Sequence, residues 1–411
     1  MSSSTHPRSD PPGAAEENAP PATRRSRGAS LASVNAVVAE VARRGRVSFA
    51  EFMDLALYHP TAGYYTRHRT GGGPTGRSGD FLTAPTASPI FGRTLAELVR
   101  QLAVSLSEPL TFVELGAGEG VLLSGLLEQL GEARRDVLCR TLAVEVGEWA
   151  RKRIAKRCKG VEVASRLLEA RWPAGPVVLF ASELYDALSV HRVTVQGLER
   201  GHALVEYFVE PDGKGGLRWT MGEPSRPEVL SYLREHGLTL EDGQVAEIRP
   251  QARAIHAEHL RWCGADAVAF VVDYGHISRK LYDPRARRHG SLVGYRAHAL
   301  VEDVLADPGQ VDITAHVNFD DLQNAASDAG WDRGEMRPLG SFLTLHGALS
   351  FLPPGVACGE PLSPQEWGEL AAAKRLLLPS GMGSDLKVLA QGKGRAWQAY
   401  LRLATPPPSE A

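Results

Sequence analysis

The sequence predicts an α/β protein built on a doubly wound, mostly parallel sheet, with an N-terminal helical extension and an inserted antiparallel β-rich module. Short apolar runs, each as long as one strand, alternate with helical patterns through the middle of the chain. A glycine-rich turn joins the first of these runs to its helix. Before the last run, residues that alternate with period two interrupt the pattern. Alternating strands and helices are typical of parallel sheets with helical crossovers.

The expected elements follow a simple order. Helical patterns at 31–45 and 47–59 lead into a Gly- and Tyr-rich loop at 60–81, which a helix at 87–106 follows. The core strands are expected at 111–115, 141–145, 160–163, 177–181 and 267–273. The later elements are expected to be helices at 318–330 and 364–378 and closing strands at 386–391 and 396–404.

The stretch between the fourth and fifth strands is irregular. It runs from Ser182 to Asp266, far longer than the ~30 residues of a plain βαβ unit. The segments 191–196, 202–210 and 217–222 alternate with period two, which indicates an inserted antiparallel sheet. A helical pattern then leads into the fifth strand.

The chain of 411 residues exceeds the usual size of one compact core, so we expect several parts. The expected parts are a disordered tail at 1–30, a helical and loop region at 31–110 that forms part of the site, a main α/β domain at 111–404 with an insertion at about 187–262, and a disordered tail at 405–411.

Composition and charge limit the possible partners. Hydrophobic residues make up 43% and charged residues 23% of the chain, as in ordinary globular proteins. A net charge of −2 gives no electrostatic reason to expect nucleic acid. The basic run at 151–159 lies on an expected amphipathic helix, which favours a solvated face. No apolar stretch approaches the ~18 residues that a membrane span needs, so we expect no membrane insertion.

The cysteines point to a reducing compartment. Cys139, Cys158, Cys263 and Cys358 lie far apart without a C-x-x-C motif, which argues against a zinc site and a disulfide framework. We therefore expect no bound metal and a cytoplasmic location.

The motif ELGAGEG, which begins at Glu114, is the most informative segment of the chain. Gly116 and Gly118 let the backbone turn tightly and approach a ligand without an intervening Cβ. A dinucleotide fold has its last glycine one position after Gly120, where this chain has Val121. The spacing resembles motif I of class I S-adenosylmethionine methyltransferases, although an ordinary βα turn is the alternative. The candidates for cofactor binding in this motif are Glu114, Gly116, Gly118 and Gly120.

A second acid, Glu145, ends the expected strand at 141–145. A carboxylate at this position of an α/β fold can accept hydrogen bonds from both hydroxyls of a ribose. The alternative is that Glu145 caps the helix that follows. The glycine-rich motif upstream favours the ribose.

Two further acids follow the fourth strand. Glu183 and Asp186 are three residues apart, so they can share one face of a first helical turn. Carboxylates there can orient a guanidinium nucleophile and share its positive charge, which makes both residues candidates for catalysis. The alternative is helix capping, because acids are favoured at a helix start without any catalytic role.

The remaining polar candidates are weaker. Gly79 and Asp80 lie in the Gly-rich N-terminal loop, which we expect to act as a lid and to reach the cofactor. An irregular surface loop is the alternative. Asp273 and His276 follow the fifth strand. The histidines at 59, 298 and 316 are expected to be structural.

Several separated motifs together resemble the MidA-like family of S-adenosylmethionine-dependent methyltransferases, which includes a mitochondrial assembly factor for respiratory complex I. The resemblance runs from about residue 47 to about residue 394. Its motifs, in order, are YHP at 58–60 with GYY at 63–65, GDFLTAP at 79–85, ELGAGEG at 114–120, SELYDAL at 182–188, VDYGH at 272–276 and DITAHV at 312–317.

The resemblance implies a class I methyltransferase fold, S-adenosylmethionine as cofactor, and a protein arginine as acceptor in the mitochondrial branch. It implies that Gly116, Gly118 and Glu145 bind the cofactor and that Glu183 and Asp186 face the acceptor. The chain departs from the family pattern by having serine at 182 in place of asparagine and serine at 189 in place of proline. It also has Leu-Tyr at 184–185 where the family has an aromatic pair. The amide lost at 182 bears on the identity of the acceptor more than on the cofactor.

Three hypotheses about function follow. The first is methyl transfer from S-adenosylmethionine to an arginine side chain of a protein, with a respiratory complex subunit as one candidate substrate. The second is a non-catalytic cofactor-binding assembly or scaffold protein, and the third is a small-molecule methyltransferase, because one fold serves many acceptors. The expected partners are a protein substrate and a second copy of the chain in a homodimer. Nucleic acid is not expected as a partner.

Overall fold

The computed structural model describes residues 27–69, 73–76, 79–198 and 201–405. The tails expected at 1–30 and 405–411 lie almost wholly outside the described residues. The first helix, α1 (Arg27–Arg44), begins before the expected start of structure at residue 31. The domain bounds themselves stay a prediction.

The centre of the molecule is an eight-stranded sheet, and the expected doubly wound sheet is confirmed. Strands β15, β16, β10, β5, β2, β3 and β4 lie in that spatial order, and β14 pairs with β10. The pairs from β4 across to β10 are parallel, whereas β16 and β15 are antiparallel additions at one edge. The strand bounds are β2 (Leu110–Leu115), β3 (Leu138–Val144), β4 (Glu162–Ala164), β5 (Val177–Ser182), β10 (Ala267–His276), β14 (Val317–Asn318), β15 (Asp332–Pro338) and β16 (Leu386–Lys393).

Helices cover both faces of this sheet because successive strand residues point to opposite sides. Phe112 packs in one core with residues of α4, α5, α7, α12, α14 and α16, while its neighbour Val113 packs in a second core with α9 and α11. Both faces of β2 are therefore buried, as its run of apolar residues requires. These helices are α4 (Ile90–Leu106), α5 (Val121–Leu130), α7 (Glu148–Arg157), α9 (Pro250–Trp262), α11 (Phe319–Asp328), α12 (Leu339–Leu345), α14 (Pro364–Leu377) and α16 (Gly394–Ala404).

Short helical turns connect the main elements. They are α3 (Ala84–Ala87), η1 (Gly131–Ala133), α6 (Arg134–Val137), η2 (Leu167–Glu169), α10 (Ser278–Leu281), η3 (Ala348–Phe351), α13 (Pro354–Cys358) and α15 (Met382–Asp385).

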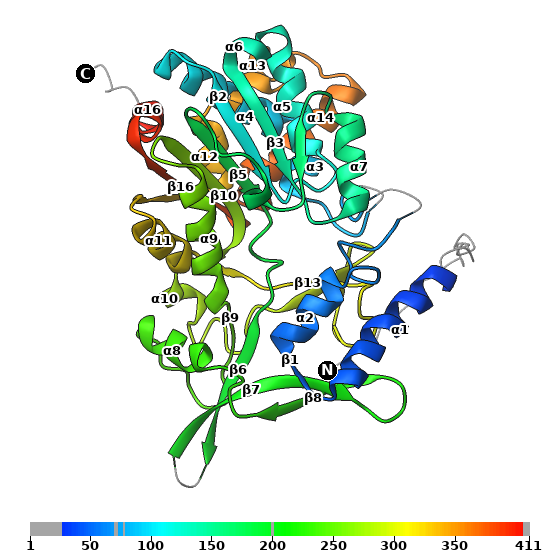
Figure 1. The fold of residues 1–411 in the computed structure, drawn as a ribbon. Helices are drawn as coiled ribbons and strands as arrows, with labels where there is room; N and C mark the ends of the chain where they lie inside the picture. The colour runs from blue at the N-terminus through cyan, green and yellow to red at the C-terminus, as the bar shows by residue number, and fades with distance from the viewer. Residues whose placement is uncertain (1–26, 70–72, 77–78, 199–200, 406–411) are drawn as a thin grey trace, which may run out of the picture.

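A second, antiparallel sheet holds the expected insertion and lies below the central sheet in Figure 1. It also takes in β1 from the N-terminal region, which pairs with β7. The elements of this layer are α2 (Phe49–Tyr58), β1 (Val47–Ser48), β6 (His191–Leu198), β7 (Gly201–Pro211), β8 (Leu217–Gly222), α8 (Pro227–Glu235) and β9 (Val245–Ile248). The helix α9, expected at the end of the insertion, instead packs on the central sheet through Leu260 and Trp262.

Two expectations about the later elements need correction. Residues 396–404, expected as a strand, form most of α16, because Trp397, Tyr400 and Ala404 recur at helical spacing and bury one face. A third sheet was not expected at all. It consists of β11 (Val293–Arg296), β12 (Ala299–Val301) and β13 (Asp312–Thr314), and each strand is too short to show a period in the sequence.

Candidate functional site

A cleft of about 1110 Å³ lies at the carboxyl ends of the central strands. Open α/β sheets bind their ligands at this edge. The opposite wall comes from α2, the loop before α3, and strands β11 and β13. The candidates that line the cleft are Glu114, Gly116, Gly118, Glu145, Glu183 and Asp186.

The glycine-rich turn leaves open space on the cleft side. Gly116 and Gly118 have φ angles of 65° and 52°, in the left-handed region that favours glycine. The N–H of Gly116 donates to the carbonyl of Val144 at 2.9 Å, which holds the turn against β3. A Cβ added at Gly118 meets no atom within 4 Å, so the backbone there faces room for a ligand.

Glu145 both lines the cleft and ties two backbone segments together. Its Oε2 accepts from the N–H of Gly118 at 2.9 Å, and its Oε1 accepts from the N–H of Gly147 at 2.8 Å. Because each carboxylate oxygen has a second lone pair, these bonds leave acceptor capacity for ribose hydroxyls. The capping and ribose alternatives are therefore compatible.

Glu114 lies beneath the turn with one carboxylate oxygen unpaired within the described ranges. Its Oε2 is buried without a partner among the described residues. Burial, and then the negative charge of Glu145, raises the pKa of Glu114 to about 8. A positive ammonium group of a ligand would stabilise the ionised form of this buried carboxyl. The methionine end of S-adenosylmethionine carries such a group. The open backbone at Gly118 and this unpaired oxygen together fit the expected cofactor.

Gly120, Gly79 and Asp80 are candidates that the structure does not bring to the cleft wall. A Cβ at Gly120 would meet Cys158 Sγ at 3.2 Å, so this glycine lets α5 approach α7. Both carboxylate oxygens of Asp80 are engaged, Oδ2 by the hydroxyl of Tyr64 at 2.7 Å and Oδ1 by the N–H of Ala297 at 2.9 Å. Asp80 thus joins the N-terminal loop to the β11–β12 turn. A cofactor role for these three residues stays a prediction.

Glu183 has a strained backbone at the end of β5. Its φ of 51° is rare for a residue with a side chain, and such strain is found at functional sites. Its Oε1 accepts from the N–H of Ala84 at 2.8 Å. Burial raises the pKa of Glu183 to about 8, and the charges of Asp186 and Asp312 act in the same direction.

Asp186 is buried beside a guanidinium. Burial raises its pKa, while the positive charge of Arg249 opposes the shift. Arg249 donates to the backbone carbonyl of Asp186 at 2.9 Å and to that of Ala315 at 2.9 Å, so it holds this turn against the segment after β13. Asp273 accepts from the N–H groups of Tyr185 and Asp186, which gives it a positioning role.

Sequence reasoning missed one acid, Asp312, at the start of β13. It is 2% exposed and lines the cleft opposite the strand ends. Its Oδ1 accepts from the hydroxyl of Tyr65 at 2.6 Å. Burial raises the pKa of Asp312 to about 7, against the opposing effect of the Tyr65 hydrogen bond. The DITAHV motif contains this residue, but nothing local indicates that it faces Glu183. Of the histidines, His259, His298 and His316 line the cleft, whereas His59 and His276 do not.

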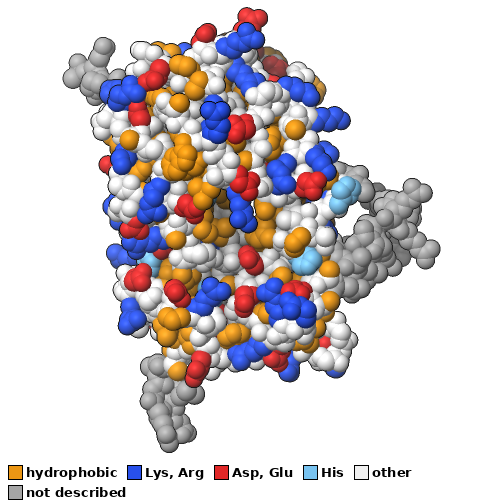
Figure 2. Space-filling view, in the orientation of Figure 1, with side chains coloured by type: hydrophobic (Ala, Val, Ile, Leu, Met, Phe, Trp, Pro, Cys, Tyr) orange, Lys and Arg blue, Asp and Glu red, His pale blue; other side chains and the backbone are white. Residues whose placement is uncertain are grey.

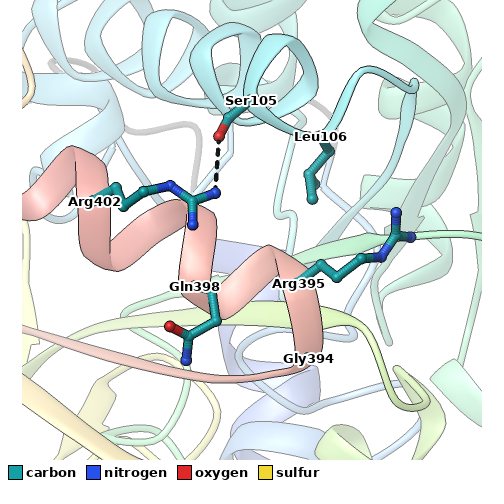
Figure 3. Close-up of a pocket in the computed structure, with 6 residues that line it drawn as sticks. All are labelled: Ser105, Leu106, Gly394, Arg395, Gln398 and Arg402. Atoms are coloured by element: carbon teal, nitrogen blue, oxygen red, sulfur yellow. Dashed lines mark hydrogen bonds between the residues drawn. The ribbon is translucent and has the colours of Figure 1, made fainter.

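The other surfaces of the molecule are weaker candidates for a ligand site than the cleft. A smaller pocket of about 530 Å³ lies between α4 and α16, where Arg402 donates to the hydroxyl of Ser105 (Figure 3). Since α4 ends just before β2 begins, this pocket is at the opposite edge of the sheet.

On the face in Figure 2, basic and acidic side chains are interspersed. Within the described ranges, no helix is both long and apolar enough to cross a membrane. The same ranges hold no cluster of three or more potential metal ligands.

Comparison with known proteins gives one matching family. The model of Methyltransf_28, a family of S-adenosyl-L-methionine-dependent methyltransferases, matches residues 90–336. Among curated relatives, the protein arginine methyltransferase NDUFAF7, mitochondrial, of Danio rerio is 28% identical over 337 residues, which cover 74% of this chain and 75% of the relative. The Homo sapiens protein of the same name is 28% identical over 312 residues, or 69% of this chain and 66% of the relative.

A solved structure is also similar over most of its length. The crystal structure of a COG1565 superfamily member from Burkholderia thailandensis bound to S-adenosyl-homocysteine has a TM-score of 0.75 and 29% identity. The match covers 92% of this chain and 95% of that chain. The expected fold class is confirmed.

The expectation of a cytoplasmic location is wrong by these comparisons, because the curated relatives are mitochondrial proteins. Dispersed free thiols indicate a reducing compartment, but they do not distinguish one reducing compartment from another.

Proposed function

The chain belongs to the Methyltransf_28 family of S-adenosylmethionine-dependent methyltransferases, and from this premise we propose that it methylates an arginine side chain of a protein. Methyl transfer with this cofactor is the family's activity. The acceptor is our proposal. It is supported by the curated relatives named protein arginine methyltransferases and by the chemistry of the cleft.

One observation carries the choice of acceptor: three carboxyl groups from two segments line one cleft, with Asp186 and Asp312 buried and Glu183 half-buried. Glu183 and Asp186 follow β5, and Asp312 begins β13 on the other wall. Burial raises the pKa of each, and the positive charges of Arg249 near Asp186 and of Arg69 near Asp312 offset this only in part, so a further positive charge would stabilise the carboxylates. A guanidinium would supply that charge and could form bidentate hydrogen bonds with a carboxylate.

Aromatic side chains complete this half of the cleft. Besides Tyr185, the cleft-lining tyrosines are Tyr58, Tyr65, Tyr274 and Tyr295. Tyr58 and Tyr65 have ring centroids 5.7 Å apart in a stacked arrangement. Aromatic faces attract cations, and Arg side chains stack on them readily. Carboxylates edged by tyrosine rings favour a cationic planar acceptor over a neutral one.

The proposed mechanism assigns distinct tasks to the residues of this chain. When bound, S-adenosylmethionine supplies an electrophilic methyl group. Glu183, fixed through Ala84 and its strained backbone, would orient one edge of the guanidinium and accept the proton released on methylation. Asp312 would hold the opposite edge, with its own position set by Tyr65.

We extend the proposal to the protein substrate, which we infer to be a subunit of a respiratory complex. The support is the resemblance to the family that contains a complex I assembly factor, together with the mitochondrial relatives. Pairing into a homodimer is an expectation from the same resemblance, and sedimentation of the purified protein tests it.

The test is transfer of labelled methyl groups to proteins of a lysate from a deletion strain, followed by mass spectrometry of the labelled peptides. We expect label on arginine, and its loss with Glu183→Gln. Label on a small molecule alone would favour a small-molecule methyltransferase. Binding of S-adenosylhomocysteine without transfer to any acceptor would favour the scaffold alternative.

A further inference from the structure

A buried chain of polar side chains runs from the central sheet to the cleft. Gln391 on β16 contacts His256 on α9, with 2.7 Å between Gln391 Oε1 and His256 Nε2. His256 Nδ1 is 2.6 Å from the hydroxyl of Tyr185, and that hydroxyl is 3.1 Å from Nδ1 of His259. Gln391, His256 and Tyr185 are fully buried, and Tyr185 and His259 border the cleft.

The amide of Gln391 fixes the first tautomer of this chain. Its Nε2 donates to the backbone carbonyls of Leu322 and Arg333, at 3.0 and 3.1 Å. Carbonyls accept only, so the amide nitrogen must face them and its oxygen must face His256. His256 Nε2 is therefore the protonated nitrogen. Burial lowers the pKa of His256 to about 4, so the ring is neutral and Nδ1 carries a lone pair.

The tautomer of His259 follows when the donors and acceptors around Tyr185 are counted in the same way. The single hydroxyl hydrogen of Tyr185 is donated to Nδ1 of His256. The oxygen of Tyr185 can then only accept, so Nδ1 of His259 must donate to it. Burial lowers the pKa of His259 to about 3, which leaves a neutral ring with its lone pair on Nε2. Among the described residues, Nε2 has no hydrogen-bond partner and is not sealed from the cleft.

The place of His259 in the cleft indicates what its Nε2 contacts. Its helix α9 packs against η2, which follows β4, so His259 lies on the side of the cleft beyond Glu145. The neighbouring cleft wall is largely apolar. Its apolar members are Val146, Leu167, Leu168, Leu184 and Ile255. Ser165 is engaged as a donor to Glu169, Arg166 carries donors only, and the carboxylate of Glu258, which also lines this wall, belongs to an exposed residue. His259 therefore presents a hydrogen-bond acceptor, Nε2, on a mostly apolar wall. Such a surface suits a flat heteroaromatic ring that carries an amino group.

We propose that the Gln391–His256–Tyr185 chain sets the tautomer of His259 so that its Nε2 accepts a hydrogen bond from the 6-amino group of the cofactor's adenine. The proposal rests on the cofactor lying along Gly118 and Glu145, as argued above. It assigns His259 as a specificity-determining residue. Tyr185 and His256 act through it as positioning residues.

Binding of two ligands tests the proposal. One is S-adenosylhomocysteine, and the other is its hypoxanthine analogue, in which an oxygen acceptor replaces the 6-amino donor. We expect the protein to prefer the adenine ligand by tenfold or more in calorimetry, because acceptor would face acceptor with the analogue. His259→Leu should reduce this ratio to near one. Tyr185→Phe should reduce it severalfold, because the tautomer of His259 is then free.

Two controls separate the possible failures. Tyr232→Phe removes the hydroxyl of another buried tyrosine, which bonds to Asp321 away from the cleft, and should leave the ratio unchanged. Nitrogen-15 spectra of the histidines should show His259 protonated at Nδ1, with a shift toward the other tautomer in Tyr185→Phe. An unchanged ratio in both His259→Leu and Tyr185→Phe, with the adenine ligand still bound, overturns the inference. Absence of binding to either ligand in the unaltered protein would instead overturn the proposed cofactor site.

Discussion

The side chain of Glu145 accepts a hydrogen bond from the backbone N–H of Gly118 across 2.9 Å. This contact joins the end of β3 to the glycine-rich turn after β2. The two best cofactor candidates of the sequence therefore form one unit in the structure. An acid at this position shapes the turn as well as presenting oxygens to a ligand.

Replacement of Gly118 tests the space at this turn. Gly118→Ala places a methyl group in open space on the cleft side, so we expect affinity for S-adenosylhomocysteine to fall about tenfold or more. Gly237 is a matched control, since its φ is +59° and an added Cβ also meets no atom within 4 Å. Both variants should lose about 1 kcal/mol of stability through backbone strain. Equal affinity in Gly118→Ala and Gly237→Ala would contradict a ligand at this turn.

The acids after β5 should affect turnover more than cofactor binding. With Glu183→Gln we expect kcat to fall about a hundredfold or more, because the amide neither accepts the released proton nor balances the guanidinium. Affinity for S-adenosylhomocysteine should stay within a factor of about two. The exposed Glu241 supplies a Glu→Gln control with unchanged turnover. A parallel loss of cofactor affinity in Glu183→Gln would place this residue on the cofactor side instead.

The raised pKa values predict how stability depends on pH without ligand. Burial raises the pKa of both Glu114 and Glu183 from 4.5 to about 8. Between these values the two groups hold protons in the folded protein that they have released in the unfolded chain, so the stability that they contribute is greatest below about pH 4.5 and falls as the pH rises toward 8. Urea unfolding between pH 5 and 8 should show this decline, and a flatter profile in Glu183→Gln. A steeper decline in the variant is the outcome that contradicts the assignment.

Asp80 offers a test between anchoring and direct cofactor contact. Because Asp80 accepts from Tyr64, an anchor role predicts that Tyr64→Phe and Asp80→Asn have similar effects. Both should speed proteolysis in the loop before α3 and change affinity for S-adenosylhomocysteine by less than about threefold. An affinity loss confined to Asp80→Asn would support the original prediction that Asp80 binds the cofactor.

The local pattern of the sequence predicted most of the central layer. Each of the five expected core strands is present within a few residues, because buried parallel strands must be apolar along their whole length. The exception in the later chain is instructive. The segment at 396–404 was expected as a strand, but its apolar residues serve a helix that packs against the sheet. Short apolar runs fit both periods, and only the partner surface decides between them.

By itself, the sequence determined the central parallel strands, the glycine turn at 116–118, and the acids at the strand ends. These features depend on backbone conformation and periodicity within a few residues. Tertiary structure alone decided that Asp312 faces Glu183 across one cleft, that Asp80 is engaged by Tyr64 and Ala297, and that Gln391 reaches His259 through two buried side chains. Such contacts join segments far apart in the chain. They exist only once the sheets pack, because burial then forces each polar group to find its partner.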